Sequence, residues 1–268
     1  MNLYSKPNTT VIFFLTAIYC TASNAHDPVF GLGPHTLFKG ATEVHFGFDR
    51  SVAGNNKLTL STLELAYGLT GNWTARLELP YEDRDGGANG TSDIGFATKY
   101  RFWRRDSLGV QESSSAFLKV KPNTAGNNRG TGTTDSIVGL AYGYESRKWY
   151  RWAAVRYRYN GETPGNLERG DKLLLDLAGG IRLRQSSYLE PDWVWMLELN
   201  GERTAKNELN GDKVNSSGGT EWFLSPGLMW TLRNFAIKTG AQLQVISDMN
   251  GNQAESDYRA RIEFEWHL

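Results

Sequence analysis

Histidine is rare in this chain, and three of its four copies lie near the start. They are His26, His35 and His45, and the fourth is His267 at the other end. Imidazole nitrogens bind zinc and copper ions, and a free amino group on His26 would add another nitrogen ligand for Cu(II). The three N-terminal histidines therefore predict a metal site, copper above all. The alternative is that His26 begins a flexible lead and His45 is one more polar strand residue.

The first 25 residues are typical of a cleaved signal peptide. Lys6 gives a basic start, residues 11–19 form a short apolar core, and Ser23-Asn24-Ala25 fits a cleavage site that makes His26 the first mature residue. A membrane anchor is the alternative, but its apolar core would have to be longer. The one cysteine, Cys20, lies within this segment, so we expect an exported protein without disulfides.

In the segments that must hold these side chains, apolar and polar residues alternate with a period of two. In residues 257–268, DYRARIEFEWHL, one set of alternate positions is apolar and the other is almost entirely charged. Successive side chains of a strand point to opposite faces, so one face would be apolar and the other ionic. The same alternation occurs in about twelve segments of roughly ten residues, the length of a tilted membrane-spanning strand. These segments are 41–49, 60–69, 72–81, 92–102, 117–124, 134–145, 152–159, 172–183, 192–200, 220–232, 235–247 and 257–268.

The connections between these segments alternate between tight turns and longer polar stretches. Residues 70–72, 145–148 and 233–234 are short, whereas 160–170 and 201–219 are long and polar. Aromatic residues gather beside the short turns, among them Tyr67, Trp73, Trp149, Trp193 and Trp266. Rings with a polar edge favour the boundary between membrane and water, so this placement predicts an aromatic girdle.

Together these patterns predict an all-β, antiparallel, up-and-down transmembrane barrel of about twelve strands, with both termini periplasmic. A soluble sandwich or barrel is the alternative, since alternation alone does not separate the two. We expect a signal peptide at 1–25, a periplasmic lead or partial plug at 26–40 and the barrel at 41–268. This places the protein in the outer membrane of a Gram-negative bacterium, surrounded by lipid. The last strand resembles the signal that the outer-membrane assembly machinery reads, although that signal usually ends in Phe rather than Leu268.

The polar face of each strand would line the lumen. Its charges are either a polar path that selects solutes or a packed ionic core, and the sequence leaves both open. The 29 basic and 29 acidic residues balance, so nucleic acid is not an expected partner. The predicted lumen-lining residues are Arg76, Glu78, Lys99, Arg101, Arg156, Arg158, Asp176, Arg182, Arg259, Arg261, Glu263 and Glu265.

Several stretches resemble a known family of outer-membrane barrels. They are residues 26–50, HDPVFGLGPHTLFKGATEVHFGFDR, then 64–81, ELAYGLTGNWTARLELPY, then 91–102, TSDIGFATKYRF, and 131–145, TGTTDSIVGLAYGYE. The chain is similar to the outer-membrane transporter proteins grouped as the meta-pathway of phenol degradation family. The resemblance implies passive passage of small, often apolar or aromatic solutes and brings no catalytic motif and no cofactor.

Other functions stay open from the sequence. One is a copper-binding envelope barrel that uses the N-terminal histidines, and another is a structural or adhesive barrel whose loop at 201–219 meets a partner. A surface Ser–His hydrolase would need a histidine base within hydrogen-bond reach of a serine. The strand histidines, His45 and His267, are expected to point inward, so we expect no enzyme.

Overall fold

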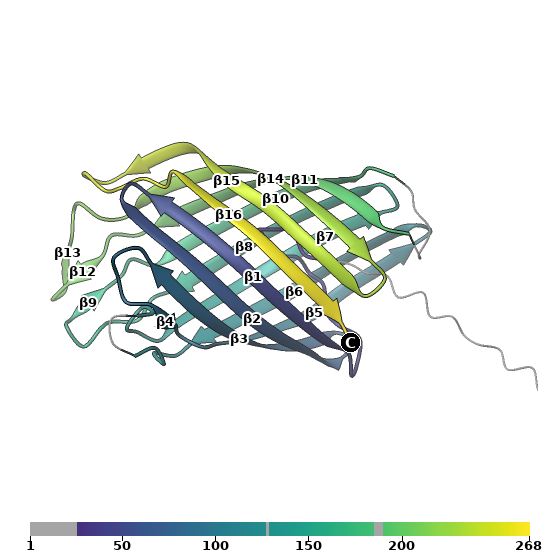
Figure 1. The fold of residues 1–268 in the computed structure, drawn as a ribbon, viewed down its shortest axis with the longest axis horizontal. Coiled ribbons are helices and arrows are strands. Elements are labelled where there is room, and N and C mark those ends of the chain that lie inside the picture. The colour runs from purple at the N-terminus through teal and green to yellow at the C-terminus, as the bar shows by residue number, and fades with distance from the viewer. Residues whose placement is uncertain (1–25, 127–128, 185–189) are drawn as a thin grey trace, which may run out of the picture.

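The computed structural model of the protein (Figure 1) describes residues 26–126, 129–184 and 190–268. The predicted signal peptide, residues 1–25, lies outside the described residues. Within the described part, no helix is long and apolar enough to cross a membrane.

Long antiparallel strands form a closed barrel, which confirms the predicted fold. The described residues contain twelve such strands, and the first of them, β1, pairs with both β2 and the last, β16, so the sheet has no free edge. Strand alternation explains this, because every second side chain can face lipid while the backbone is fully paired. The strands are β1 (Thr42–Ala53), β2 (Asn56–Thr70), β3 (Trp73–Arg84), β5 (Gly95–Ser107), β6 (Val110–Lys121), β7 (Asp135–Ser146), β8 (Trp149–Tyr159), β10 (Lys172–Arg182), β11 (Asp192–Thr204), β14 (Gly219–Leu232), β15 (Phe235–Met249) and β16 (Tyr258–His267).

The closing strand β16 illustrates how the two faces differ. Tyr258, Ile262 and Trp266 are exposed on the outside, where a soluble protein would have polar groups, whereas Glu265 on the inner face is 3% exposed. Exposed apolar residues outside and buried charges inside are the reverse of a soluble fold. The outer face is therefore built for lipid.

The two ends of the barrel differ in their connections. Tight turns such as 71–72, 108–109 and 233–234 lie at one end, together with the nine-residue connection 183–191, and the longest connections lie at the other end. The long connections carry four two-residue strands, β4 (Gly90–Thr91), β9 (Leu167–Glu168), β12 (Glu208–Leu209) and β13 (Asp212–Lys213). One connection at that end is short, because β1 and β2 are joined only by residues 54–55. Both β1 and β16 meet the short-turn end, where the Leu268 amide donates to the Thr42 carbonyl at 2.9 Å.

The main departure from the expected strand limits is β6. It begins at Val110, whereas the alternation predicts residues 117–124. The added half, Val110–Ala116, contains three serines in a row and no aromatic residue, so it has no apolar face that a pattern search can detect. Strand β5 likewise continues to Ser107, past a register shift between Arg101 and Trp103 that interrupts the alternation.

Aromatic side chains form a connected band near the short turns. Trp193 and Trp230 lie with ring centroids 6.3 Å apart, Trp230 and Phe235 6.0 Å apart, and Phe235 and Trp266 4.9 Å apart. These rings come from β11, β14, β15 and β16 and lie on outward-facing positions. Such a band suits the boundary between lipid and water, as expected for a membrane barrel.

Candidate functional site

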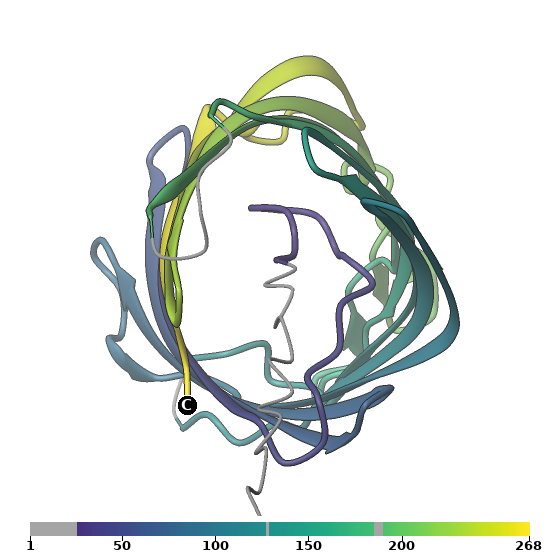
Figure 2. The same cartoon turned by 90° about the vertical axis from the view of Figure 1, so that its right-hand side faces the viewer.

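The first described residues lie inside the barrel. Viewed along the barrel, residues 26–40 run through the ring of strands and join β1 at its rim (Figure 2). Pro28, Gly31, Gly33 and Pro34 interrupt the stretch, so it makes no regular ladder with the wall. We refer to residues 26–40 as the N-terminal segment.

One carboxylate in the wall holds the middle of the N-terminal segment. Glu198 on β11 accepts hydrogen bonds from the backbone N–H groups of Val29 at 2.7 Å, Phe30 at 3.2 Å and Gly31 at 2.9 Å. Its side chain is among the most buried in the protein. A buried carboxylate needs such donors, because removing an unpaired charge from water costs roughly several kcal/mol of desolvation free energy. The wall carboxylate therefore provides the hydrogen-bond acceptor that these backbone N–H groups need, and the N–H groups compensate its buried charge.

Charged contacts fix the rest of the N-terminal segment. Asp27 lies 2.6 Å from the ammonium of Lys99 on β5, and Arg261 on β16 donates to the Val29 carbonyl at 2.8 Å. Further along, the Leu37 amide donates to the hydroxyl of Thr74 on β3 at 2.9 Å. The segment is thus tied to several separate strands and crosses the lumen.

Glycines on the inner wall make room for this path. A Cβ at Gly227 would lie 2.9 Å from Val29, one at Gly240 would lie 3.0 Å from Phe30, and one at Gly143 would lie 2.8 Å from Pro34. Any larger residue would collide with the N-terminal segment, since such distances are below van der Waals contact.

A cavity of about 990 Å³ remains between the N-terminal segment and the wall. Its lining combines charged groups such as Glu64 and Arg76 with apolar side chains such as Leu32, Phe117 and Ile137. Cavities of roughly 300–1,000 Å³ accommodate small organic molecules. The lumen therefore holds a space of ligand size even with the segment inside.

Eight of the twelve predicted lumen charges line the cavity, and Arg158, Asp176, Arg182 and Arg259 do not. Each of the twelve has a charged or polar partner, so the wall carries ion pairs rather than a continuous basic patch. The pairs are Arg76 with Glu64, Glu78 with Lys119, Lys99 with Asp27, Arg101 with Asn72, Arg156 with Asp176, Arg158 with Asp135, Arg182 with Asp192, Arg259 with Glu202, Arg261 with Asp49, Glu263 with Lys238 and Glu265 with His26.

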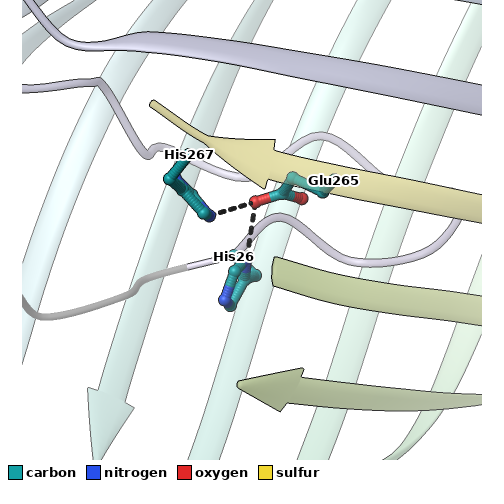
Figure 3. Close-up of side chains that lie close together, drawn as sticks. All are labelled: His26, Glu265 and His267. Carbon is teal, nitrogen blue, oxygen red and sulfur yellow. Dashed lines mark hydrogen bonds and ion pairs between the residues drawn. The ribbon is translucent and has the colours of Figure 1, made fainter. Parts of the chain in front are cut away.

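The four histidines do not form a single group. His26 and His267 both approach Glu265 on β16 (Figure 3). His45 pairs with Glu43 on β1 and also lies near Glu265. His35 instead pairs with Glu145 on β7. As the pairing of the last strand with the first allows, the β1–β16 register brings His267 to the same place as His45. The spacing of the N-terminal histidines could not indicate the partner acids, Glu43 and Glu265.

Comparison with known proteins agrees with this architecture. A family model described as "Putative MetA-pathway of phenol degradation" matches residues 25–256. The chain belongs to this family. Comparison with curated protein sequences gives no significant match.

Among solved structures, the COG4313 outer membrane channel from Pseudomonas putida F1 is similar with a TM-score of 0.68 and 14% identity, over 91% of this chain and 100% of that one. The NanC porin is similar with a TM-score of 0.53 and 12% identity, over 85% of this chain and 100% of that one. Both similarities concern the fold alone, which is that of an outer-membrane β-barrel.

Proposed function

We propose that this barrel is a passive channel for small solutes and that the N-terminal segment narrows its lumen. The observation that carries the proposal is the cavity of about 990 Å³ inside a closed barrel, bounded on one side by a segment that is not part of the wall. Hydrogen bonds and ion pairs hold that segment, and such contacts can open without unfolding any strand.

The solutes we propose are apolar or aromatic compounds with a polar substituent. Two observations support this class: the description of the matched family and the mixed lining of the cavity. Leu32, Phe117 and Ile137 offer apolar contact to a ring, and nearby charged groups such as Arg76 offer hydrogen bonds to a hydroxyl or carboxylate.

We also propose an orientation of the barrel in the membrane. The short turns and both ends of the barrel chain face the periplasm, and the long connections face outward, as in other outer-membrane barrels. The chain reaches this position by export with a cleaved signal peptide, followed by insertion through the outer-membrane assembly machinery.

Current through the purified protein in planar bilayers tests the channel. We expect Glu198→Ala to increase conductance several-fold, because three backbone N–H groups of the N-terminal segment lose their acceptor, about 3 kcal/mol of hydrogen bonding to a charged group. Glu202→Ala is the matched control, since it removes another β11 carboxylate, a partly buried one, which pairs with Arg259 and Lys172 instead of the segment. If neither the wild type nor Glu198→Ala conducts, the protein is not a channel.

Liposome swelling tests the class of solute. Vesicles that contain the Glu198→Ala protein should swell faster in hydroxybenzoate-type aromatics than in neutral sugars of similar size. Equal rates for both would leave the channel but remove the preference for aromatic compounds.

A further inference from the structure

Imidazoles and carboxylates converge where the two ends of the barrel chain meet. Strands β1 and β16 pair Glu43 with His267 and His45 with Glu265, so all four side chains face inward at neighbouring positions. His26 of the N-terminal segment completes the group from the lumen side. We call these five residues the seam cluster.

The distances within the seam cluster are short. Glu265 Oε1 lies 2.8 Å from His26 Nδ1 and 2.9 Å from His267 Nε2 (Figure 3). Two sets, His26–Glu265–His267 and Glu43–His45–Glu265, each offer three ligand atoms within 4.8 Å of one another. Two ligand atoms, each at about 2.0–2.1 Å from one ion, lie roughly 3 Å apart at the right angles of a tetragonal Cu²⁺ site and roughly 3.4 Å apart in a tetrahedral Zn²⁺ site. The spacing therefore suits a shared ion.

Buried nitrogens in the seam cluster lack hydrogen bonds. Among the described residues, the Nε2 atoms of His26, His45 and His267 are buried without a hydrogen bond. His45 Nε2 nevertheless lies 3.0 Å from Glu43 Oε2, and the His26 ring is hydrogen-bonded to Glu265 through Nδ1. His267 Nε2 and Glu265 Oε1 are close neighbours, yet their geometry is not that of a hydrogen bond. Buried polar atoms are normally satisfied, so these nitrogens are available to a further partner such as a metal ion.

The charge around the seam cluster favours a cation. Glu43, Glu263 and Glu265 bring three negative charges, and Lys238, 2.7 Å from Glu263, brings one positive charge. The neighbouring ions Asp27 and Arg261 already pair with Lys99 and Asp49. With neutral imidazoles two negative charges remain, which one divalent ion would balance.

We propose that the seam cluster is a binding site for a divalent transition-metal ion, with His26, Glu265 and His267 as ligands and with Glu43 and His45 beside them. Imidazole with carboxylate suits Zn²⁺ and Cu²⁺ better than Mg²⁺ or Ca²⁺, which prefer oxygen ligands alone. Since His26 belongs to the N-terminal segment and the other ligand residues belong to the wall, a bound ion joins the two.

Titration of the protein purified from the outer membrane with ZnCl₂, and separately with CuCl₂, tests the site by calorimetry in detergent. We expect one ion per barrel, and affinity roughly 10–100-fold weaker in His26→Gln, in His267→Gln and in Glu265→Gln. His35→Gln is the matched control, because His35 is an imidazole of the same segment that pairs with Glu145 instead. Its affinity should equal that of the wild type.

Circular dichroism of each variant establishes that the barrel is folded before its affinity is compared. Absence of metal binding in the wild type would overturn the site. Two protonated imidazoles would then balance the two remaining negative charges. Binding that persists in the folded His26→Gln and His267→Gln proteins would overturn it equally. The readout needs no current, so failure of the channel proposal would leave this test unaffected.

Discussion

At the scale of single residues, glycines on the inner wall make room for the N-terminal segment. Gly227 lies on β14 opposite Val29, which is 2% exposed and packs with Val194, Met196 and Met229. Val29 therefore cannot move aside without opening a buried apolar cluster. The path of the N-terminal segment is therefore determined as much by the positions of the wall glycines as by the hydrogen bonds of the segment.

Substitution of Gly227 by Val should expel this part of the N-terminal segment. Overpacking of a filled core costs about 1–3 kcal/mol, so a cysteine introduced by Val29→Cys should react with a maleimide roughly 10-fold faster or more in the Gly227→Val background. The described residues contain no competing cysteine. Gly179→Val is the control, because nothing lies within 4 Å of a Cβ at Gly179. Equal labelling rates in both backgrounds would show that the glycine is not needed for docking.

Residue types alone indicated part of the site. Alternation was enough to place Arg76 or Arg261 on the lumen side, because a period of two needs no partner information. The contact of His26 with Glu265 spans 239 residues and depends on how the strands close, so sequence spacing could not give it. Inward glycines such as Gly227 were a usable signal, since a lumen-facing position without a side chain indicates close approach of another chain segment.

At the scale of elements, long connections are anchored to strands by buried acids. Asp93 lies between β4 and β5, is 1% exposed, and accepts hydrogen bonds from the backbone amides of Thr124, Ala125 and Thr131 at 2.8–3.0 Å. Lys121 lies 3.2 Å from the same carboxylate. One side chain thus organises the connection that follows β6.

The anchoring by Asp93 should depend on pH. Burial alone would raise the pKa of Asp93, but the amides of Ala125 and Thr131 and the nearby Lys121 outweigh it, so the pKa is lowered. A lowered folded-state pKa means that the contribution to stability is complete above the ordinary carboxyl pKa of about 4 and is lost as pH falls through the folded value. Hydrogen exchange of the amides of Thr124 and Ala125, corrected for intrinsic rates, should stay slow at pH 7 and rise only in strong acid.

Asp93→Asn provides the comparison for that profile. The amide keeps one acceptor oxygen and has no charge, so exchange at pH 7 should increase about 10-fold, equivalent to roughly 1.4 kcal/mol, and its pH dependence should vanish. A wild-type profile that already changes between pH 5 and pH 7 would contradict the assignment.

The elements themselves were largely predictable. Apolar alternation identified every barrel strand of the described chain, because lipid outside and charge inside give each strand two distinct faces. It failed in the first half of β6, where Ser113, Ser114 and Ser115 remove the contrast. The course of residues 26–40 was not predictable, since no periodicity describes an irregular segment whose partners lie on distant strands.

At the scale of the whole molecule, the outer surface is a belt of aliphatic side chains near mid-height. Leu177 on β10 is 54% exposed and lies five residues from each end of its strand. In water such a residue would tolerate or favour a charge, whereas in a bilayer an arginine there costs about 2–4 kcal/mol.

Leu177→Arg should therefore reduce the free energy of unfolding by that amount when the protein is folded in lipid vesicles and unfolded with urea. Leu209→Arg is the matched control, because Leu209 is a leucine of similar exposure, 45%, in β12 within a long connection. It should change stability by less than about 0.5 kcal/mol. Equal effects of the two substitutions would mean that the belt does not face lipid.

The ten residue pairs between β1 and β16 also constrain the order in which the strands pair during assembly of the barrel. All other neighbouring strands of the barrel follow each other in the chain and can form as hairpins, whereas this pairing joins residues more than 200 positions apart. Closing so long a loop carries a large entropic cost, so it is expected last, after a curved open sheet with two bare edges. Glu43 and His45 lie on one of those edges, and Glu265 and His267 lie on the other. The imidazole–carboxylate group that they form cannot exist in any unfinished intermediate, and its appearance marks the moment when assembly is complete.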